Sequence, residues 1–167
     1  SINAAVAQRA PMFAPGEVQI VWVTGAADAA RAREAAHGAP VPVQIHAFID
    51  DMAAAFAAAD LVVARSGAST TAELAFMHKP SILVPYPNAT DNHQEHNARA
   101  FVDAGAAVLL RDSELTSAIL LGAIRELLGG PVRLAAMARA AGTMAKPGAA
   151  DVIAAEILSL AFGEGKE

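Results

Sequence analysis

The stretch "RSGASTTAE", residues 65–73, combines small residues, hydroxyl groups and one carboxylate in a pattern that suits an anionic ligand. Small residues let a ligand approach the backbone closely, and glycine adds conformational freedom. A helix predicted to begin near Ser69 or Thr70 would present unpaired amide groups, and its dipole favours a phosphate group. The residues that would line this phosphate site are Ser66, Gly67, Ala68, Ser69 and Thr70.

A structural interpretation of the same stretch stays open. Thr70 and Glu73 have the spacing of a helix capping box, and a Ser-Gly pair is common in turns. The stretch has neither the Gly-Lys-Ser/Thr ending of a P-loop nor the GxGxxG pattern of a dinucleotide-binding loop. The loop alone does not decide between phosphate binding and helix capping.

Polar side chains crowd the start of a second predicted helix, after the strand that ends in "VPYP". Amide and imidazole groups there could bind sugar hydroxyls, which need paired donors and acceptors. His93 and His96 could also suggest a metal, but a third ligand with clear spacing is missing. A plainer alternative is that Asp91 or Asn92 caps the helix and the other residues face solvent. The set is Asp91, Asn92, His93, Gln94, His96 and Asn97.

A third stretch, "AFIDDMAAAF", offers Phe48 and Ile49 at the end of a predicted strand. An aromatic face beside strand-end backbone suits a flat base, although these residues taken alone fit a core better than a pocket. Asp50 and Asp51 resemble a pair of metal ligands, but helix capping explains them better. No Ser-His-Asp set can be assigned anywhere in the chain.

The elements that must position these three stretches alternate along the chain. Short Val/Ile/Leu runs alternate with helices, a pattern typical of parallel strands covered on both faces. We therefore predict an α/β fold with a doubly wound, Rossmann-like parallel sheet and a helical C-terminal tail. The predicted strands are 18–25, 41–48, 61–65, 81–86 and 106–110. The predicted helices are 2–13, 26–38, 50–59, 69–78, 93–104, 113–128, 131–143 and 149–162, with residues 163–167 as a frayed tail.

Composition limits the class of protein. The chain has 167 residues, with 54% apolar and 17% charged residues, which favours one folded domain over disorder. A net charge of −5 argues against a nucleic-acid partner, and the lack of cysteine excludes disulfides and thiolate chemistry. No apolar run approaches the roughly 20 residues of a membrane span, and the first residues do not resemble a signal peptide. The cytoplasm is the expected compartment.

All three stretches follow strands, so a parallel sheet would bring them to the edge where its ligands bind. Together they suggest a base, a phosphate with a ribose, and a sugar, which is the shape of a nucleotide sugar. The combination of FIDDM, RSGA-S-T-x-x-E and D-x-HQ-x-x-NA, in this order, closely resembles the C-terminal domain of the MurG family. These bacterial transferases move N-acetylglucosamine (GlcNAc) from UDP-GlcNAc to lipid I, which becomes lipid II in peptidoglycan synthesis.

The resemblance implies the nucleotide-binding half of a two-domain GT-B glycosyltransferase, with no metal and no cofactor. By its motifs, the Ile49 backbone would meet the uracil edge, with Phe48 beside the base. The amides of Ala68, Ser69 and Thr70 would face the diphosphate and the sugar.

The remaining roles concern the ribose and the sugar. Glu73 would bind both ribose hydroxyls, whereas His93 and Gln94 would read the GlcNAc hydroxyls. Arg65, Ser66 and Gly67 belong to the same motif, and the resemblance gives neither Arg65 nor Ser66 a definite role.

The chain also departs from the family. A strand and a GGSxGA loop are expected before the segment that resembles "SINAAV", and an N-terminal domain should hold lipid I, the membrane-facing patch and the catalytic base. We therefore expect residues 1–162 to be a donor-binding domain with a gap in its sheet, without catalytic residues and inactive alone. The full-length protein would be peripheral on the cytoplasmic face of the inner membrane. Two alternatives stay open: a stand-alone binding subunit with a separate membrane partner, and another UDP-sugar enzyme of the GT-B fold.

Overall fold

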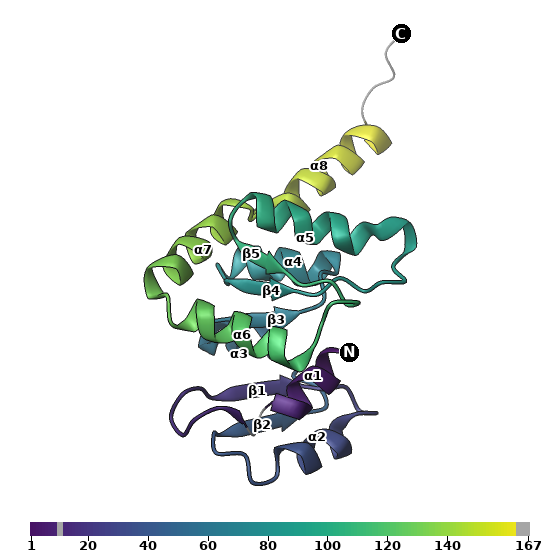
Figure 1. The fold of residues 1–167 in the computed structure, drawn as a ribbon. Coiled ribbons are helices and arrows are strands. Elements are labelled where there is room, and N and C mark those ends of the chain that lie inside the picture. Colours follow the sequence, from purple (N-terminus) through teal and green to yellow (C-terminus); the bar gives the residue numbers. More distant parts are fainter. Residues whose placement is uncertain (10–11, 163–167) are drawn as a thin grey trace.

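A computed structural model describes residues 1–9 and 12–162, so the predicted tail at 163–167 lies outside the described residues. Figure 1 shows helices and parallel strands alternating along the chain. The strands are β1 (Ile20–Val23), β2 (Val43–His46), β3 (Val62–Ala64), β4 (Ser81–Leu83) and β5 (Ala107–Leu109). The helices are α1 (Ile2–Arg9), α2 (Ala29–Ala36), α3 (Met52–Ala58), α4 (Ala68–Phe76), η2 (Thr90–Asn92), α5 (His93–Asp103), α6 (Ser117–Leu128), α7 (Pro131–Thr143) and α8 (Ala149–Phe162).

The strands form two parallel sheets, so the doubly wound sheet that the sequence predicts is interrupted by a gap. One sheet pairs β1 with β2, and the other has the order β3-β4-β5. In Figure 1 the two-stranded sheet lies below the three-stranded one, with β1 on the side nearer β3. The expected gap therefore lies between β1 and β3, and no rearranged strand among the described residues fills it.

The three-stranded sheet is covered on both faces, as a parallel sheet requires. Ile82 and Leu83 are neighbours on β4, point to opposite faces and are both fully buried. Leu83 packs in a cluster with residues of α3, α4, α5 and α7, including Phe56 and Leu74. Ile82 packs instead with residues of α1, α6 and α7. This half of the molecule is thus doubly wound, as predicted.

The two-stranded sheet is thinner. Trp22 is only 5% exposed, whereas its neighbours Val21 and Val23 are 52% and 42% exposed. A small cluster of Phe13, Val41 and Leu121 connects this sheet to α6 of the other half. One face of β1 is therefore well packed, and the other is open.

The ends of two helices differ in how well the sequence predicts them. Asp51 caps α3, since its carboxylate accepts from the Ala54 N–H at 2.9 Å, as expected. The predicted start of α4 is wrong, because the helix begins at Ala68 with Gly67 at the N-cap position. The Thr70–Glu73 capping box is consequently wrong too, since Thr70 lies inside the first turn.

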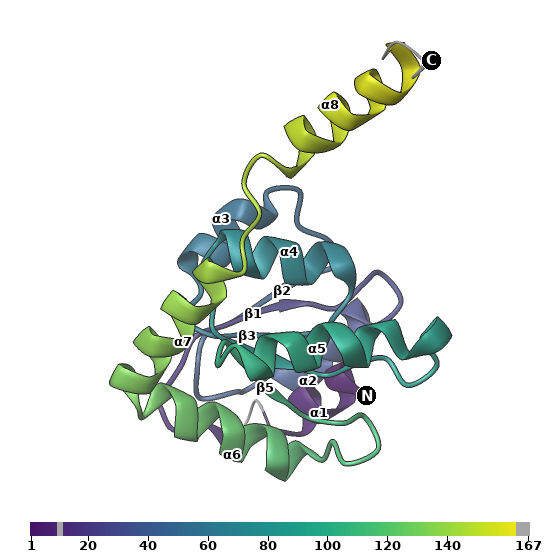
Figure 2. The same ribbon diagram turned by 90° about the horizontal axis from the view of Figure 1, so that it is seen from above.

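The last helix, α8, extends away from the body of the molecule (Figure 2). All of its residues are exposed, including Ile153, Ile157, Leu160 and Phe162. Within the described residues, no helix has the length and apolar character needed to cross a bilayer.

Candidate functional site

The candidate site is formed by loops that follow the carboxyl ends of the strands, as the sequence predicts. β3, β4 and β5 run parallel, so the segments that follow them leave the sheet on the same side. Residues 65–70 follow β3, residues 84–92 follow β4, and residues 110–112 follow β5. In the other sheet, Phe48 and Ile49 follow β2. The three predicted stretches are therefore all placed after parallel strands, as the sequence indicates.

The loop after β3 leads directly into α4 with its first amides uncapped. Gly67 occupies the N-cap position, and among the described residues no side chain accepts a hydrogen bond from the first N–H groups of the helix. The first hydrogen bond of the helix runs from the Thr71 N–H to the Gly67 carbonyl at 2.9 Å. The amides of Ala68, Ser69 and Thr70 precede it and so have no partner within the helix. Three adjacent N–H groups at a positive helix end can hold a phosphate group.

Ser66, just before this turn, connects it to the second loop. Its side chain is fully buried, and its hydroxyl donates to the Gln94 carbonyl at 2.7 Å. A second hydrogen bond joins the same two segments, since the side-chain amide of Asn97 donates to the Ser66 carbonyl at 3.0 Å. The Ser66 hydroxyl hydrogen is thus already used within the fold. Its part in ligand binding stays a prediction, and its observed part is to hold the two loops together.

His93 and Gln94 are the first residues of α5, and each keeps one side-chain hydrogen-bonding group that its contacts within the protein do not use. The Gln94 side-chain carbonyl accepts from the Tyr86 N–H at 3.0 Å, which leaves its NH₂ group as a donor. His93 Nδ1 lies 2.7 Å from the Thr90 carbonyl, which can only accept, so Nδ1 carries a hydrogen. Nε2 of a neutral His93 is then an acceptor. The start of α5 thus offers one donor, on Gln94, and one acceptor, on His93, and sugar hydroxyls can use both.

Two residues before α5 have unusual backbone conformations. Asp91 and Asn92 have φ values of 50° and 53°, in the left-handed region that residues other than glycine rarely adopt. Asn92 lies at the N-cap position of α5 but makes no capping hydrogen bond through its side chain. Helix capping by these residues, the plainer alternative for this stretch, is therefore wrong.

Glu73 lies in the second turn of α4, and its side chain is exposed. Among the residues that the structure describes, no hydrogen-bond or ion-pair partner is found for its carboxylate. A helix cap would have engaged this group, whereas a group that binds a ligand must be available to it. The structure does not test the ribose assignment, but it removes the competing structural role.

Phe48 is 74% exposed, so its assignment to a core is wrong. Ile49, next to it, is half-buried and immediately precedes the Asp50–Asp51 start of α3. An exposed aromatic ring beside strand-end backbone remains consistent with contact to a flat base.

A charged cluster centred on Arg65 was not predicted from the sequence. Arg65 forms an ion pair with Asp112 at 2.6 Å, and its guanidinium lies 5.5 Å from the centre of the Tyr86 ring. The Ser1 hydroxyl bonds to the same carboxylate. The hydrogen bond from Ser1, followed by the one from Arg65, lowers the pKa of Asp112 despite its partial burial. No spacing in the sequence connects Arg65 with Asp112, so only the fold could show this pair.

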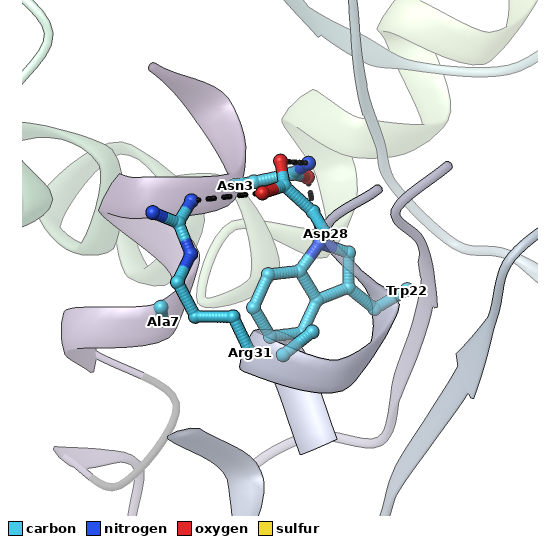
Figure 3. A pocket seen from close by; sticks show the side chains of 6 residues that line it. Asn3, Ala7, Trp22, Asp28 and Arg31 are labelled. Atoms are coloured by element: carbon cyan, nitrogen blue, oxygen red, sulfur yellow. Dashed lines mark hydrogen bonds and ion pairs between the residues drawn. The ribbon is translucent and has the colours of Figure 1, made fainter. Parts of the chain in front are cut away.

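Figure 3 shows a second polar group, between α1, β1 and α2. Asn3 donates to Asp28 at 2.7 Å and accepts from the Trp22 indole N–H at 3.0 Å. Arg31 forms an ion pair with Asp28 at 3.1 Å. These side chains satisfy one another, and we assign them a structural role in holding α1 against β1.

No set of three or more potential ligand side chains (His, Cys, Asp or Glu) lies close enough to hold a metal ion in the part of the chain that the structure describes. What the arrangement offers is hydrogen bonding. It presents uncapped amides for an anion, a donor–acceptor pair for hydroxyls, an available carboxylate and an exposed aromatic ring.

Comparison with known proteins shows the family to which the chain belongs. Residues 1–153 match the model of the glycosyltransferase family 28 C-terminal domain. Two relatives are named UDP-N-acetylglucosamine–N-acetylmuramyl-(pentapeptide) pyrophosphoryl-undecaprenol N-acetylglucosamine transferase. The one from Anaeromyxobacter sp. (strain K) is 46% identical over 90% of this chain, and the one from Chlorobium luteolum is 43% identical over 96%. The chain spans 41% and 44% of their lengths, so it corresponds to less than half of each relative.

Solved structures give the same result for the fold. The crystal structure of Acinetobacter baumannii MurG matches 93% of this chain with a TM-score of 0.80 and 29% identity, over 48% of that protein. The glycosyltransferase VinC, solved with dTDP, has a TM-score of 0.71 at 18% identity, which shows a shared fold alone. By sequence and by fold, this chain belongs to the family of glycosyltransferase family 28 C-terminal domains.

Proposed function

We propose that this chain is the donor-binding part of an inverting N-acetylglucosaminyltransferase that uses UDP-GlcNAc. The observation that carries the proposal is the connection of two loops at one sheet edge. The uncapped amides at 68–70 and the His93–Gln94 pair are fixed to each other through the hydrogen bond from Ser66 to the Gln94 carbonyl. A ligand that carries a diphosphate and a sugar would use both loops at once.

In this proposal the amides of Ala68, Ser69 and Thr70 bind the diphosphate, with Gly67 allowing its close approach. His93 accepts from one sugar hydroxyl, and the Gln94 NH₂ group donates to another. Water exclusion from such polar groups would give sugar discrimination. Because both groups lie at an exposed edge here, we expect only a weak preference for UDP-GlcNAc over UDP-glucose in this chain.

The nucleoside would bind across the gap to the other sheet. Phe48 lies beside the base, the Ile49 backbone meets the uracil edge, and Glu73 binds the ribose hydroxyls. No metal or cofactor takes part, because the amides and the helix dipole supply the positive potential that the diphosphate needs.

The acceptor follows from the relatives' name, and we propose it for the whole protein. That name describes transfer to N-acetylmuramyl-(pentapeptide) pyrophosphoryl-undecaprenol, or lipid I. The residues that bind this acceptor, the catalytic base and the contact with the membrane surface would belong to an N-terminal domain. Such a protein would act at the cytoplasmic face of the bacterial inner membrane, and this chain alone should not turn over substrate.

Glu73 gives the sharpest test. In wild-type protein we expect UDP to bind more tightly than 2′-deoxy-UDP, measured by calorimetry. Glu73→Ala should abolish most of this preference, because charge-assisted hydrogen bonds contribute about 1.5–3 kcal/mol. Glu73→Gln, which keeps the shape without the charge, is the matched variant and should retain part of the preference. Equal binding of the two nucleotides by wild-type protein would refute the ribose assignment.

Two other functions share this geometry and can be separated by experiment. A stand-alone binding subunit would need a separate membrane partner, and the encoding DNA upstream of Ser1 would then hold a start codon instead of a further domain. Another UDP-sugar enzyme of the GT-B fold would bind a different donor. Competition among UDP-GlcNAc, UDP-glucose and UDP would identify that donor.

A further inference from the structure

Arg65 lies directly before the phosphate-binding turn, where a cation would be expected to contact a diphosphate. Its guanidinium points elsewhere. Nη1 donates to the carbonyls of Val84 and Pro85 at 3.1 and 2.9 Å and pairs with Asp112 at 2.6 Å. The side chain is only 31% exposed, and its donors are largely used by the protein itself.

The position of these contacts shows what they do. The backbone ladder between β3 and β4 ends where the Val84 N–H donates to the Ala64 carbonyl at 2.9 Å. The ladder between β4 and β5 ends where the Leu110 N–H donates to the Leu83 carbonyl at 3.0 Å. Arg65 lies one residue past the first of these bonds. Beyond these bonds the strands no longer pair through their backbones, and the Arg65 side chain instead links the segments that follow β3, β4 and β5.

The residue after Val84 and Pro85 links these contacts to the ligand. It is Tyr86, whose N–H donates to the Gln94 side-chain carbonyl and whose ring lies against the Arg65 guanidinium. This bond occupies the side-chain carbonyl of Gln94 and leaves its NH₂ group as the donor. Ser66 fixes the Gln94 backbone at the same time. Arg65 and Ser66 thus lie on two separate connections to Gln94, one to its side chain and one to its backbone.

We propose that Arg65 is a positioning residue that sets the orientation of Gln94 through the Val84–Tyr86 segment, and that it is not a phosphate ligand. The consequence for binding rests on the proposed function, because it assumes that Gln94 faces the sugar of a UDP-sugar. The effect on the protein itself is independent of the proposed function, because it concerns only the hydrogen bond between Tyr86 and Gln94.

The first experiment needs no ligand. Amide hydrogen exchange should be compared among wild-type protein, Arg65→Lys and Arg65→Met. The lysine variant keeps the charge and the stem but cannot reproduce the two-nitrogen fork. We expect the Tyr86 amide to exchange about tenfold faster in both variants, as one hydrogen bond of about 1.4 kcal/mol is lost, while β1 and β2 amides stay unchanged. The matched control is Arg99→Lys, which alters an exposed pair with Glu95 on α5.

The second experiment measures the ratio of affinities for UDP-GlcNAc and UDP. A variant that merely lowers the fraction of binding-competent protein lowers the apparent affinity for both ligands equally, so the ratio stays unchanged. Loss of Gln94 orientation acts on the sugar alone, so Arg65→Met should lower the ratio by about threefold to tenfold, the effect of one hydrogen bond. Arg99→Lys should not change it.

Several outcomes would overturn the proposal. If the Tyr86 amide keeps its protection in the variants, Arg65 does not hold the hydrogen bond between Tyr86 and Gln94. If amides exchange faster throughout the protein, the effect of Arg65 is on global stability and not on this hydrogen bond. Equal loss of UDP and UDP-GlcNAc affinity with unchanged exchange would make Arg65 a phosphate ligand. If wild-type protein binds neither nucleotide, the proposed function fails, and the exchange experiment still decides whether Arg65 positions Gln94.

Discussion

The two sheets of this molecule differ in how firmly they hold the loops that follow them. The three-stranded sheet is buried on both faces, and at its carboxyl ends Arg65 and Ser66 connect neighbouring loops by hydrogen bonds. The two-stranded sheet buries Trp22 on one face and leaves Val21 and Val23 exposed on the other. Phe48, which follows β2, is also largely exposed.

This difference teaches how the candidate site is built. The groups assigned to phosphate and sugar belong to the firmly connected half, so they are arranged before any ligand arrives. The groups assigned to the base belong to the other half, which contacts the first through α1 and the Phe13–Val41–Leu121 cluster. We expect the two halves to differ in local stability, with β1 and β2 amides exchanging faster than those of β4.

The largest test of this comparison is Trp22→Ala. Trp22 is the main buried side chain of the two-stranded half, and replacing a buried tryptophan by alanine costs about 3–5 kcal/mol of unfolding free energy. The change also leaves Asn3 Oδ1 without its indole donor. Chemical denaturation followed by circular dichroism measures the loss. Val21→Ala, on the exposed face of the same strand, should stay within about 0.5 kcal/mol. Similar losses for the two variants would break the comparison.

A smaller effect is expected from Gly142→Ala, which tests packing on the firmly connected half. Alanine favours a helix over glycine by about 1 kcal/mol, so Gly122→Ala on α6, where a new Cβ meets open space, should stabilise the protein. At Gly142 on α7, a Cβ would lie 2.7 Å from the His78 ring. Thermal unfolding should therefore show no gain for Gly142→Ala.

The control for that prediction removes the ring. In a His78→Ala background the clash is absent, and Gly142→Ala should regain the stabilisation seen at Gly122. A Gly142→Ala variant that is as stabilising as Gly122→Ala in the unchanged background would mean that the ring moves aside without cost.

The smallest effect concerns the connection between the halves. Glu17 precedes β1 and accepts from Arg125 of α6, with Nε at 2.5 Å. This hydrogen bond, helped by one from the Ala14 N–H, lowers the pKa of Glu17 to about 2. A lowered folded pKa means that the stabilisation is complete above about pH 4.5 and is lost as the pH falls towards 2.

The pair is exposed, so the change should be modest. We expect Glu17→Gln to lower the melting temperature at pH 7 and to reduce its fall between pH 4.5 and pH 2. Arg125→Gln should act in the same direction, since it removes the donor. A Glu17→Gln variant with the wild-type pH profile would show that this pair does not contribute to the pH dependence of stability.

Much of the fold follows from the sequence because its signals are local. The runs around Ile82, Val62 and Val108 are short, apolar and separated by helices, so strands and their parallel direction could be predicted. The strand ends could not, since pairing stops where partners diverge. The start of α4 was misplaced because Thr70 and Glu73 match a capping box, whereas Gly67 can begin the helix earlier.

The candidate site divides along the same line. The helices that carry Glu73, His93 and Gln94 follow β3 and β4, as the sequence predicts, and the ligands of these residues stay predictions. The Arg65–Asp112 pair and the link between Ser66 and Gln94 join residues that are distant in the sequence. Only the fold brings such partners together, and no periodicity signals them.

The gap between β1 and β3 has a thermodynamic consequence. Each of these strands has one edge without a strand partner among the described residues. An extended peptide that pairs there would bind the folded chain and not the unfolded one. It would stabilise the chain by an amount that grows with the logarithm of its concentration. We therefore expect the melting temperature of this chain to report on its surroundings: its own concentration, and any extended segment present to pair with the open edges.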